Sequence, residues 1–333
     1  MRNANRTLPL AALALLCSAV PAGAWHGKGH HVATTLAIEA AGGDLPKFLT
    51  AGAPTAAHCS LDPDLFTHPI APAALHGAEA PEHYFDVELL AGAAPPATRY
   101  EFLALCARKG LKGDKVGLLP YAVTEWTGRL TVALAEHRAN PDNPHVRTKC
   151  LVYAGILSHY AEDLCQPLHL TVHWDGRAKA DGTSPRTGIH KRVDALLGKL
   201  RFDKAAVLKG VRPEAFDKLL PAVLAEIGRG HRLVDRVYEI EKHLPAMDKP
   251  LAGNTPAGRF AAERLTAAVR FTASLHATAW KDSRTIKLPS WYTRPFPPPV
   301  PASTRRAAAP PCPAPRPPVY LTRSPGHRGS RHR

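Results

Sequence analysis

The sequence predicts an all-α fold, a single and mostly helical domain over residues 25–288. Long stretches of the chain carry apolar residues at helical spacing, and His and Asp recur in pairs four residues apart. β-Branched residues seldom alternate with polar residues as they do in strands. A segment of this length is ample to bury one hydrophobic core.

Residues 1–24 have the pattern of a removable secretory signal. Arg2 and Arg6 form a basic start, an apolar run follows, and small residues ending at Ala24 form a cleavage box. Cleavage there would make Trp25 the new N-terminus, and the protein would then be secreted or periplasmic. No later stretch is long and apolar enough to span a membrane.

Apolar periodicity and end signals predict seven helices in the domain. Asn143 and Pro144 suit the N-cap and the first turn of the fourth helix. Thr255 and Pro256 have the same roles in the last helix, and Pro120 is expected to break or kink the third. In chain order, the helices are expected over residues 31–41, 99–108, 116–138, 145–164, 190–200, 213–242 and 256–281.

The densest group of chemically active side chains lies near the end of the fourth predicted helix. Ile156, His159 and Asp163 recur at spacings of three and four and therefore share one face. The neighbouring face is apolar, so the helix is expected to be buried. A buried His and Asp are costly to desolvate, and a bound cation offsets that cost. His190 and Asp194 repeat the spacing, although for either pair alone a capping or salt-bridged histidine is the simpler interpretation.

The order of these residues resembles the S1/P1 nuclease family, which shares its fold with the bacterial zinc-dependent phospholipases C. The mature chain of that family begins with Trp and has a His five residues later, as Trp25 and His30 do here. Its central motif, His-x-x-x-Asp-x-x-Gln-Pro-Leu-His, is matched from His159 to His169. Its other elements are matched by His190 and Asp194, by His83-Tyr84-Phe85-Asp86, and by Asp64 with Asp62 as a rival.

The resemblance implies a domain of the phospholipase C/P1 nuclease type with a site for three zinc ions. Imidazole and carboxylate groups are good zinc ligands, and open positions filled by water are typical of a catalytic site. The implied ligands are Asp64, His83, His159 and Asp163 for one ion, the amine and carbonyl of Trp25 with His30 and the shared Asp163 for the second, and His169, His190 and Asp194 for the third.

The activity implied by the resemblance is hydrolysis of single-stranded DNA or RNA to products with 5′-phosphates, with 3′-nucleotidase activity as an addition. Asp64 and Asp163 would act through the metals, which activate a hydroxide. Tyr84 would stack on a nucleobase, and Asp86 would hydrogen-bond it beside the reacting phosphate. Alternatively, Tyr84 is a wall residue and Asp86 orients a ligand histidine. Trp174 is expected to form a second stacking surface or an ordinary buried turn.

The chain departs from the family at three positions. Thr67 stands three residues after Asp64, where family members often have Arg. Val193 replaces the Trp that precedes the last Asp ligand, and His26 replaces the usual Gly after the N-terminal Trp. These changes keep the implied ligand set and affect the expected rate and substrate preference.

Residues 289–333 differ in composition from the domain. They contain 13 Pro, eight Arg and no acidic residue, so we expect them to be disordered. The tail dominates the net charge of +15, and without the tail and the leader the basic residues exceed the acidic ones by about five. The charge therefore does not predict a nucleic-acid-binding face on the domain. The tail is expected either to contact polyanions or to act as a solvated spacer.

Five cysteines remain after removal of the leader, and one or two disulfides are expected in an oxidising compartment. Cys312 is the expected odd one. We expect the domain to act as a monomer on single-stranded nucleic acid or nucleotides.

Two other functions stay open at this level. Phospholipase C chemistry on the same metals would require apolar residues around the mouth of the site. A non-catalytic, zinc-stabilised protein that binds partners through its basic tail would belong to a different class.

Overall fold

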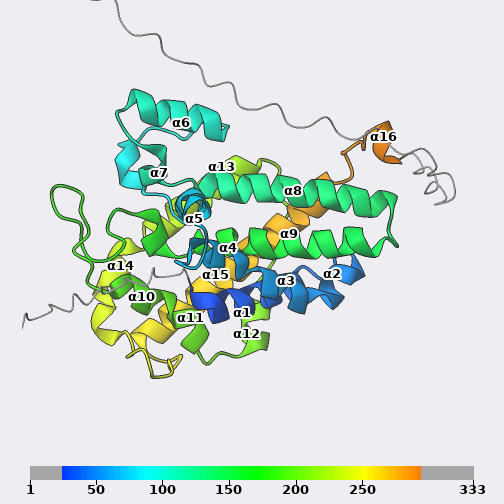
Figure 1. Ribbon diagram of the computed structural model, residues 1–333. Helices are drawn as coiled ribbons and strands as arrows, with labels where there is room; N and C mark the ends of the chain where they lie inside the picture. Colours follow the sequence, from blue (N-terminus) through cyan, green and yellow to red (C-terminus); the bar gives the residue numbers. More distant parts are fainter. Residues whose placement is uncertain (1–24, 294–333) are drawn as a thin grey trace, which may run out of the picture. The chain divides into compact units, whose positions relative to one another are not determined.

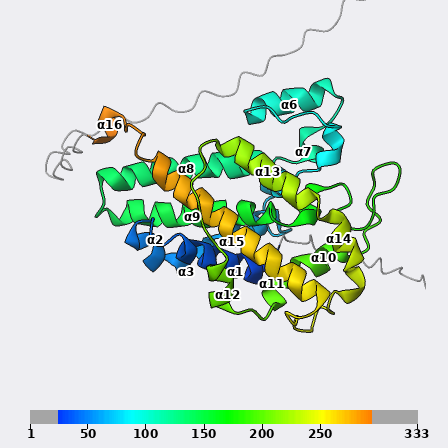
Figure 2. The ribbon, with the colours of Figure 1, turned by 180° about the vertical axis from the view of Figure 1, so that it is seen from behind.

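The computed structural model describes residues 25–293 (Figures 1 and 2). The chain divides after Pro289 into two compact units, and the second is described only in the short helix α16 (Ser290–Thr293). The predicted leader and the tail beyond Thr293 lie outside the described residues, as does Cys312. Within the described range all regular elements are helices and no strand is formed, so the all-α prediction is confirmed.

Helix α9 (Pro144–Asp163) is central to the packing of the domain. It contacts α8 (Leu119–Ala139), α3 (Ala53–Cys59), α15 (Pro256–Asp282) and α1 (His26–Ala40). Figure 1 shows α8 and α9 running side by side, and the reverse view in Figure 2 shows α15 crossing them. The helix is buried along most of its second half, as its sequence predicts.

One glycine allows α3 and α9 to approach closely. A Cβ atom on Gly155 would lie 2.3 Å from the carbonyl oxygen of Ala56, far inside van der Waals contact. Since only glycine fits there, α3 can pack directly on α9. This contact places Ser60, just beyond α3, beside the last turn of α9.

The predicted end signals occupy their expected places. The side chain of Asn143 accepts hydrogen bonds from the amides of His145 and Val146, and that of Thr255 accepts one from Gly258. Such caps each stabilise a helix by about 1 kcal/mol. Pro120 was expected to break or kink the helix over 116–138, and the chain is interrupted just before it, at residues 117–118. Pro120 itself lies in the first turn of α8, where no amide donor is needed, and does not kink that helix.

Two predicted helices are divided in the structure. Residues 213–242 form α13 (Leu219–His231), α14 (Val234–Glu239) and the 3-10 turn η4 (Glu241–His243). Before α13 the chain is not helical, because the amides of Glu214 and Phe216 donate to the hydroxyls of Ser274 and Thr278 on α15. Residues 190–200 form α10 (Ile189–Asp194) and α11 (Leu196–Lys199).

The remaining elements are mostly too short for periodicity to reveal. The helix α6 (Arg99–Arg108) has its predicted bounds and begins with a capping box of Thr98 and Glu101. The others are α2 (Lys47–Ala51), α4 (Asp62–Thr67), α5 (Ala73–Glu79), η1 (Ala80–His83), η2 (Val87–Leu90), α7 (Gly113–Val116), η3 (Pro167–Leu170) and α12 (Lys204–Lys209).

Two further expectations concern cysteines and the membrane. The four described cysteines, Cys59, Cys106, Cys150 and Cys165, are buried free thiols, so the expected disulfides are not formed among them. Among the described helices, none has the length and hydropathy of a membrane span.

Candidate metal centre

Histidine and carboxylate side chains from six segments converge at the C-terminal end of α9. They form three groups, and within each group the possible ligand atoms lie within 4.8 Å of one another. All belong to the residues that the sequence indicated. The groups are His30, His159 and Asp163; Asp64, His83 and His159; and His169, His190 and Asp194.

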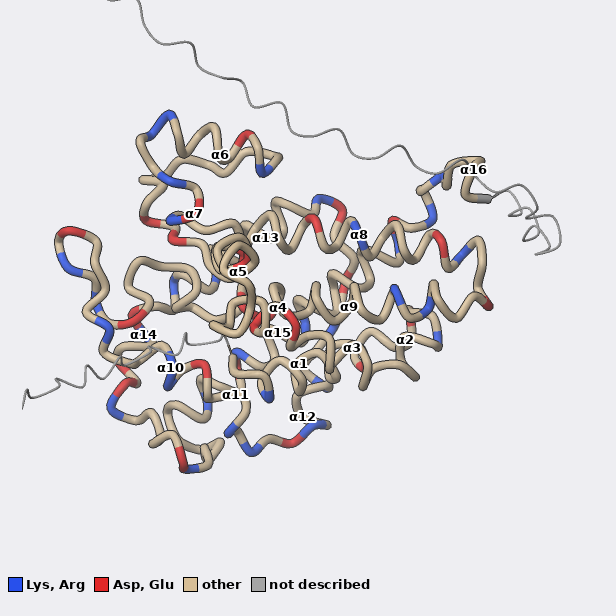
Figure 3. The backbone as a smooth tube through the Cα atoms, in the orientation of Figure 1, with Lys and Arg blue, Asp and Glu red and all other residues tan. Residues whose placement is uncertain are grey.

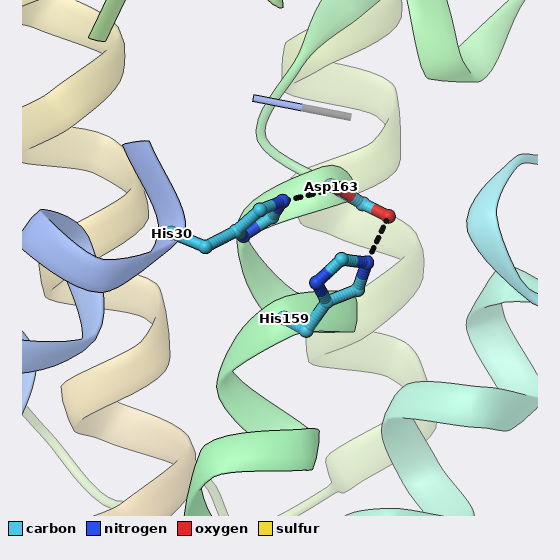
Figure 4. A group of neighbouring side chains, drawn as sticks. All are labelled: His30, His159 and Asp163. Carbon is cyan, nitrogen blue, oxygen red and sulfur yellow. Dashed lines mark ion pairs between the residues drawn. The ribbon is translucent and has the colours of Figure 1, made fainter. Parts of the chain in front are cut away.

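The first group is completely buried and centres on Asp163 (Figure 4). Its Oδ1 lies 3.3 Å from Nε2 of His30, and its Oδ2 lies 3.3 Å from Nε2 of His159. The two imidazole rings stack with their centroids 4.0 Å apart. Asp163 therefore presents a different oxygen to each histidine, an arrangement in which one carboxylate can bridge two cations.

The second group adds side chains from the short elements α4 and η1. Oδ1 of Asp64 lies 3.9 Å from Nε2 of His159, and Nδ1 of His83 lies 3.1 Å from the same nitrogen. Nδ1 of His83 is also 3.0 Å from Oδ2 of Asp163. Of the two aspartates between which the sequence left a choice, the group includes Asp64 and not Asp62.

The third group lies on η3 and α10. Asp194 Oδ2 is 3.1 Å from Nε2 of His190, and Asp194 Oδ1 is 3.8 Å from Nε2 of His169. The two imidazoles stack, with 4.9 Å between centroids. Gln166, from the central motif, donates a 2.7 Å hydrogen bond to Asp194 Oδ1 and fixes the carboxylate.

Four of the five histidine rings are oriented by a hydrogen bond at Nδ1. A donor proton on Nδ1 leaves Nε2 as the lone-pair nitrogen that can bind a metal. His83 is the exception, because its Nδ1 faces the group and its Nε2 lies 3.8 Å from Glu79. The partners are the carbonyls of Ser60 for His159, of His83 for His169 and of Trp174 for His190, and the carboxylate of Glu162 for His30.

Several buried atoms in these groups have no hydrogen-bond partner. They are Oδ1 of Asp64, Oδ1 of Asp163, Oδ2 of Asp194, and Nε2 of His83 and of His169. Buried polar atoms are normally paired, and cations bound in the separate groups would satisfy the three carboxylate oxygens and His169. A set of imidazole nitrogens and carboxylate oxygens suits zinc. The residues present therefore fit a metal centre.

The electrostatic field keeps the central carboxylates ionised. Burial by itself would raise the pKa of Asp163, but His159 and His169 hold that pKa well below its usual range. Burial likewise opposes ionisation of His169, yet Asp163 and Asp194 raise its pKa to about 9. Uptake of a cation by the third group would therefore release a proton from His169.

Two of the three groups open into a cavity of about 410 Å³, through Asp64, His83, His169 and His190. A pocket of this size suits a small molecule or a part of a polymer. His30, His159 and Asp163 do not line it and lie deeper. The lining consists of Asp64, Thr67, His76, Ala80, His83, Tyr84, Asp86, Lys115, Leu168, His169, Trp174 and His190.

The proposed specificity residues lie on the wall of this cavity. The hydroxyl of Tyr84 donates a 2.5 Å hydrogen bond to the carbonyl of Asp114, which fixes its ring. Burial and the nearby Glu88 raise the pKa of Asp86 to about 7. The hydrogen bonds that orient the ligand histidines do not come from Asp86, so the alternative role of orienting a histidine finds no support.

Glu162 is a site residue that the sequence reasoning missed. Its carboxylate accepts hydrogen bonds from Nδ1 of His30 and from the hydroxyl of Thr34, and its carbonyl accepts one from the buried indole of Trp25. The sequence contained a sign of this role, because an acidic residue next to Asp163 on a largely apolar helix is also expected to be buried and paired. Glu162 thus ties the expected N-terminus to the last turn of α9.

Comparison of the chain with protein-family models, with curated proteins and with solved structures gives no match. The site is therefore described by the geometry of its side chains. It is a buried His and Asp cluster in three groups, two of which line one cavity.

Proposed function

We propose that this protein is a zinc-dependent phosphodiesterase that hydrolyses single-stranded DNA or RNA to products with 5′-phosphates. One observation carries the proposal. Side chains from two of the candidate metal groups line the same cavity as Tyr84, Asp86 and Trp174. A phosphate and the base attached to it could thus be held side by side.

The metal side of the cavity is arranged for a phosphodiester. Asp64, His83, His159 and Asp163 would hold one zinc, His169, His190 and Asp194 another, and Asp163 would be shared with the His30 group. When bound, the ions would supply positive charge for the phosphate oxygens and a water of lowered pKa. The protein fixes the ligands through the carbonyls of Ser60, His83 and Trp174, which would keep the phosphate in a constant position.

The aromatic side chains supply the sequence-tolerant part of recognition. Tyr84 and Trp174 line the cavity, and base stacking on aromatic rings holds single strands with little sequence preference. Trp174 also lies edge-on to the His190 ring at 5.6 Å. Asp86 would accept a hydrogen bond from a base, most strongly when its carboxylate is ionised, at a pH above about 7.

The first group depends on the N-terminus that leader removal would create. The indole of Trp25 is buried against Glu162, one residue from Asp163. A free amine at Trp25 would add a nitrogen ligand beside His30. We therefore include the amine and carbonyl of Trp25 in the proposed ligand set.

The test is release of acid-soluble nucleotides from single-stranded DNA by protein that begins at Trp25. We expect release with zinc and none with a chelator. His58→Ala, on α3 but outside the three groups, is the matched control for His159→Ala. Absence of release from zinc-loaded protein would overturn the nuclease proposal.

A specific observation also favours phospholipase C chemistry as a second candidate. Leu65, Ile70 and Leu75 are 51%, 75% and 38% exposed. They lie in the segment that contributes Asp64, Thr67 and His76 to the cavity wall. Exposed apolar side chains beside a site are typical of contact with lipid. Release of phosphocholine from phosphatidylcholine vesicles, measured beside nucleotide release, discriminates between the two chemistries.

A further inference from the structure

The cavity contains one permanent positive charge among its lining residues, the side chain of Lys115. The other ionisable residues of the lining are aspartates, histidines and Tyr84. Apart from Lys115, the part of the lining outside the candidate metal groups therefore has no side chain with a permanent positive charge. A chain of phosphates that extends beyond these groups would need a cation of its own.

Lys115 is presented by a helix that is fixed to the wall carrying Tyr84 and Asp86. The amide of Asp86 donates a 2.7 Å hydrogen bond to the carbonyl of Val116, and the hydroxyl of Tyr84 donates to the carbonyl of Asp114. These two hydrogen bonds are accepted by the residues on either side of Lys115, and they hold α7 against this wall. The position of the Lys115 backbone relative to Tyr84 is thereby fixed.

A glycine directly after α7 makes this arrangement possible. Gly117 has φ 97°, and a Cβ atom there would lie 2.0 Å from the carbonyl oxygen of Tyr84. The chain can therefore pass against Tyr84 only with glycine at this position. The close approach brings Lys115 to the rim of the cavity.

The ammonium group of Lys115 is available for an external anion. Its nearest acidic partner is Asp114, at 3.9 Å, and the two side chains are 73% and 56% exposed. An exposed ion pair at this distance is weak, because water and salt screen it. Thr67, which also lines the cavity, carries no charge, and its hydroxyl donates a hydrogen bond to the carbonyl of Asp64. Figure 3 shows Lys and Arg positions interspersed with Asp and Glu positions along the described backbone.

We propose that Lys115 binds a substrate phosphate next to the one that is cleaved, on the same wall as Tyr84. The inference rests on the proposed nuclease function and makes it more specific. The substrate class is a single strand with at least two phosphates, and a mononucleotide is the poorer substrate. Lys115 is then a specificity-determining residue that does not take part in the bond cleavage.

The test compares Lys115→Ala, Lys115→Arg and the control Lys112→Ala in protein that begins at Trp25. Lys112 is exposed at the start of the same helix and does not line the cavity. For octathymidylate, Lys115→Ala should raise KM about fivefold at unchanged kcat, the size expected for an exposed charge pair. Thymidine 3′-monophosphate, with one phosphate, should show no change. Lys115→Arg should restore most of the affinity.

A binding measurement separates this proposal from the nuclease proposal. Fluorescence anisotropy with labelled phosphorothioate octathymidylate needs no turnover. The salt dependence of its affinity should become shallower by about 0.7 in logarithmic slope for Lys115→Ala, as for one lost phosphate contact on a single strand. If the wild type cleaves octathymidylate and Lys115→Ala has the same salt slope as the wild type, the proposed role of Lys115 is overturned, whereas the nuclease proposal is not. A slope change without cleavage by the wild type would overturn the nuclease function and keep the phosphate contact.

Discussion

The carboxylate of Glu162 lies 2.8 Å from Nδ1 of His30, and both side chains are completely buried. Asp163, the next residue on α9, lies 3.3 Å from Nε2 of the same ring. Two consecutive acidic residues therefore hold opposite sides of one histidine. One orients the imidazole and raises its basicity, and the other shares the cation that the imidazole would bind.

Glu162→Gln should weaken zinc binding at the His30 group by about 10- to 100-fold, as expected when the partner of a ligand histidine loses its charge. The change keeps the shape of the side chain, so the helical content should stay constant. The measurement is a competitive zinc titration with a chromophoric chelator. Glu39→Gln, an exposed acidic residue on α1, is the control. Equal zinc affinity in both variants would contradict the orienting role.

Asp163→Asn should reduce activity more than any other single ligand change, because one of its oxygens faces His30 and the other faces His159, which also belongs to the second group. His30→Ala should affect one group only. Initial rates on single-stranded DNA, with zinc content measured on the same samples, compare the two variants. Equal losses of rate and of zinc would show that Asp163 does not bridge.

A protein that keeps even one residue before Trp25 should bind one zinc fewer and lose most of its activity. The extra residue converts the amine of Trp25 into an amide, which is a poor ligand for zinc. Metal content by mass spectrometry under native conditions measures this directly. A tagged and uncleaved protein with full zinc content and full rate would refute the role of the N-terminus.

His276 should make stability depend on pH. It is fully buried on α15 without a carboxylate partner, and burial lowers its pKa to about 4. Below pH 6.5 the unfolded chain binds a proton at His276 that the folded chain does not, so stability is lost as the pH falls from 6.5 to 4. The loss amounts to about 3 kcal/mol at the end of that window.

The variant His276→Leu removes this contribution. Its free energy of unfolding in urea should fall less than that of the wild type between pH 7 and pH 4.5, with the same chelator in all samples. His231→Leu is the control, because His231 is partly exposed and paired with Glu88. Parallel curves for the wild type and His276→Leu would contradict the buried neutral histidine.

Prediction from sequence succeeded where a pattern is long or strongly marked. The bounds of α9 and its cap at Asn143 follow from apolar periodicity and one Asn-Pro pair. The division before α13 could not be predicted, because the competing hydrogen bonds come from Ser274 and Thr278, about 60 residues away. The short elements α4 and η1 were not predicted for a related reason, since a helix of four to six residues is too short to show hydrophobic periodicity.

The candidate metal residues were selected by motif, and their partners depend on tertiary structure. The spacing of His159 and Asp163 places them on one helical face from sequence alone. The carbonyl partners of the histidines belong to loops and turns whose approach no local pattern encodes. Glu162 could have been predicted as well, because it adjoins Asp163 on a largely apolar helix and would be costly to bury without a partner.

The histidine rings are held by carbonyls of segments far from them in the chain, such as Ser60 for His159 and Trp174 for His190. No stretch of the sequence contains a complete group together with its orienting partners. The complete groups therefore form only when these segments have packed together, so we expect tight binding of zinc ions to accompany the folding of the domain. Once bound, they would connect residues from 30 to 194, so their release would report the loss of the whole domain and not of one segment.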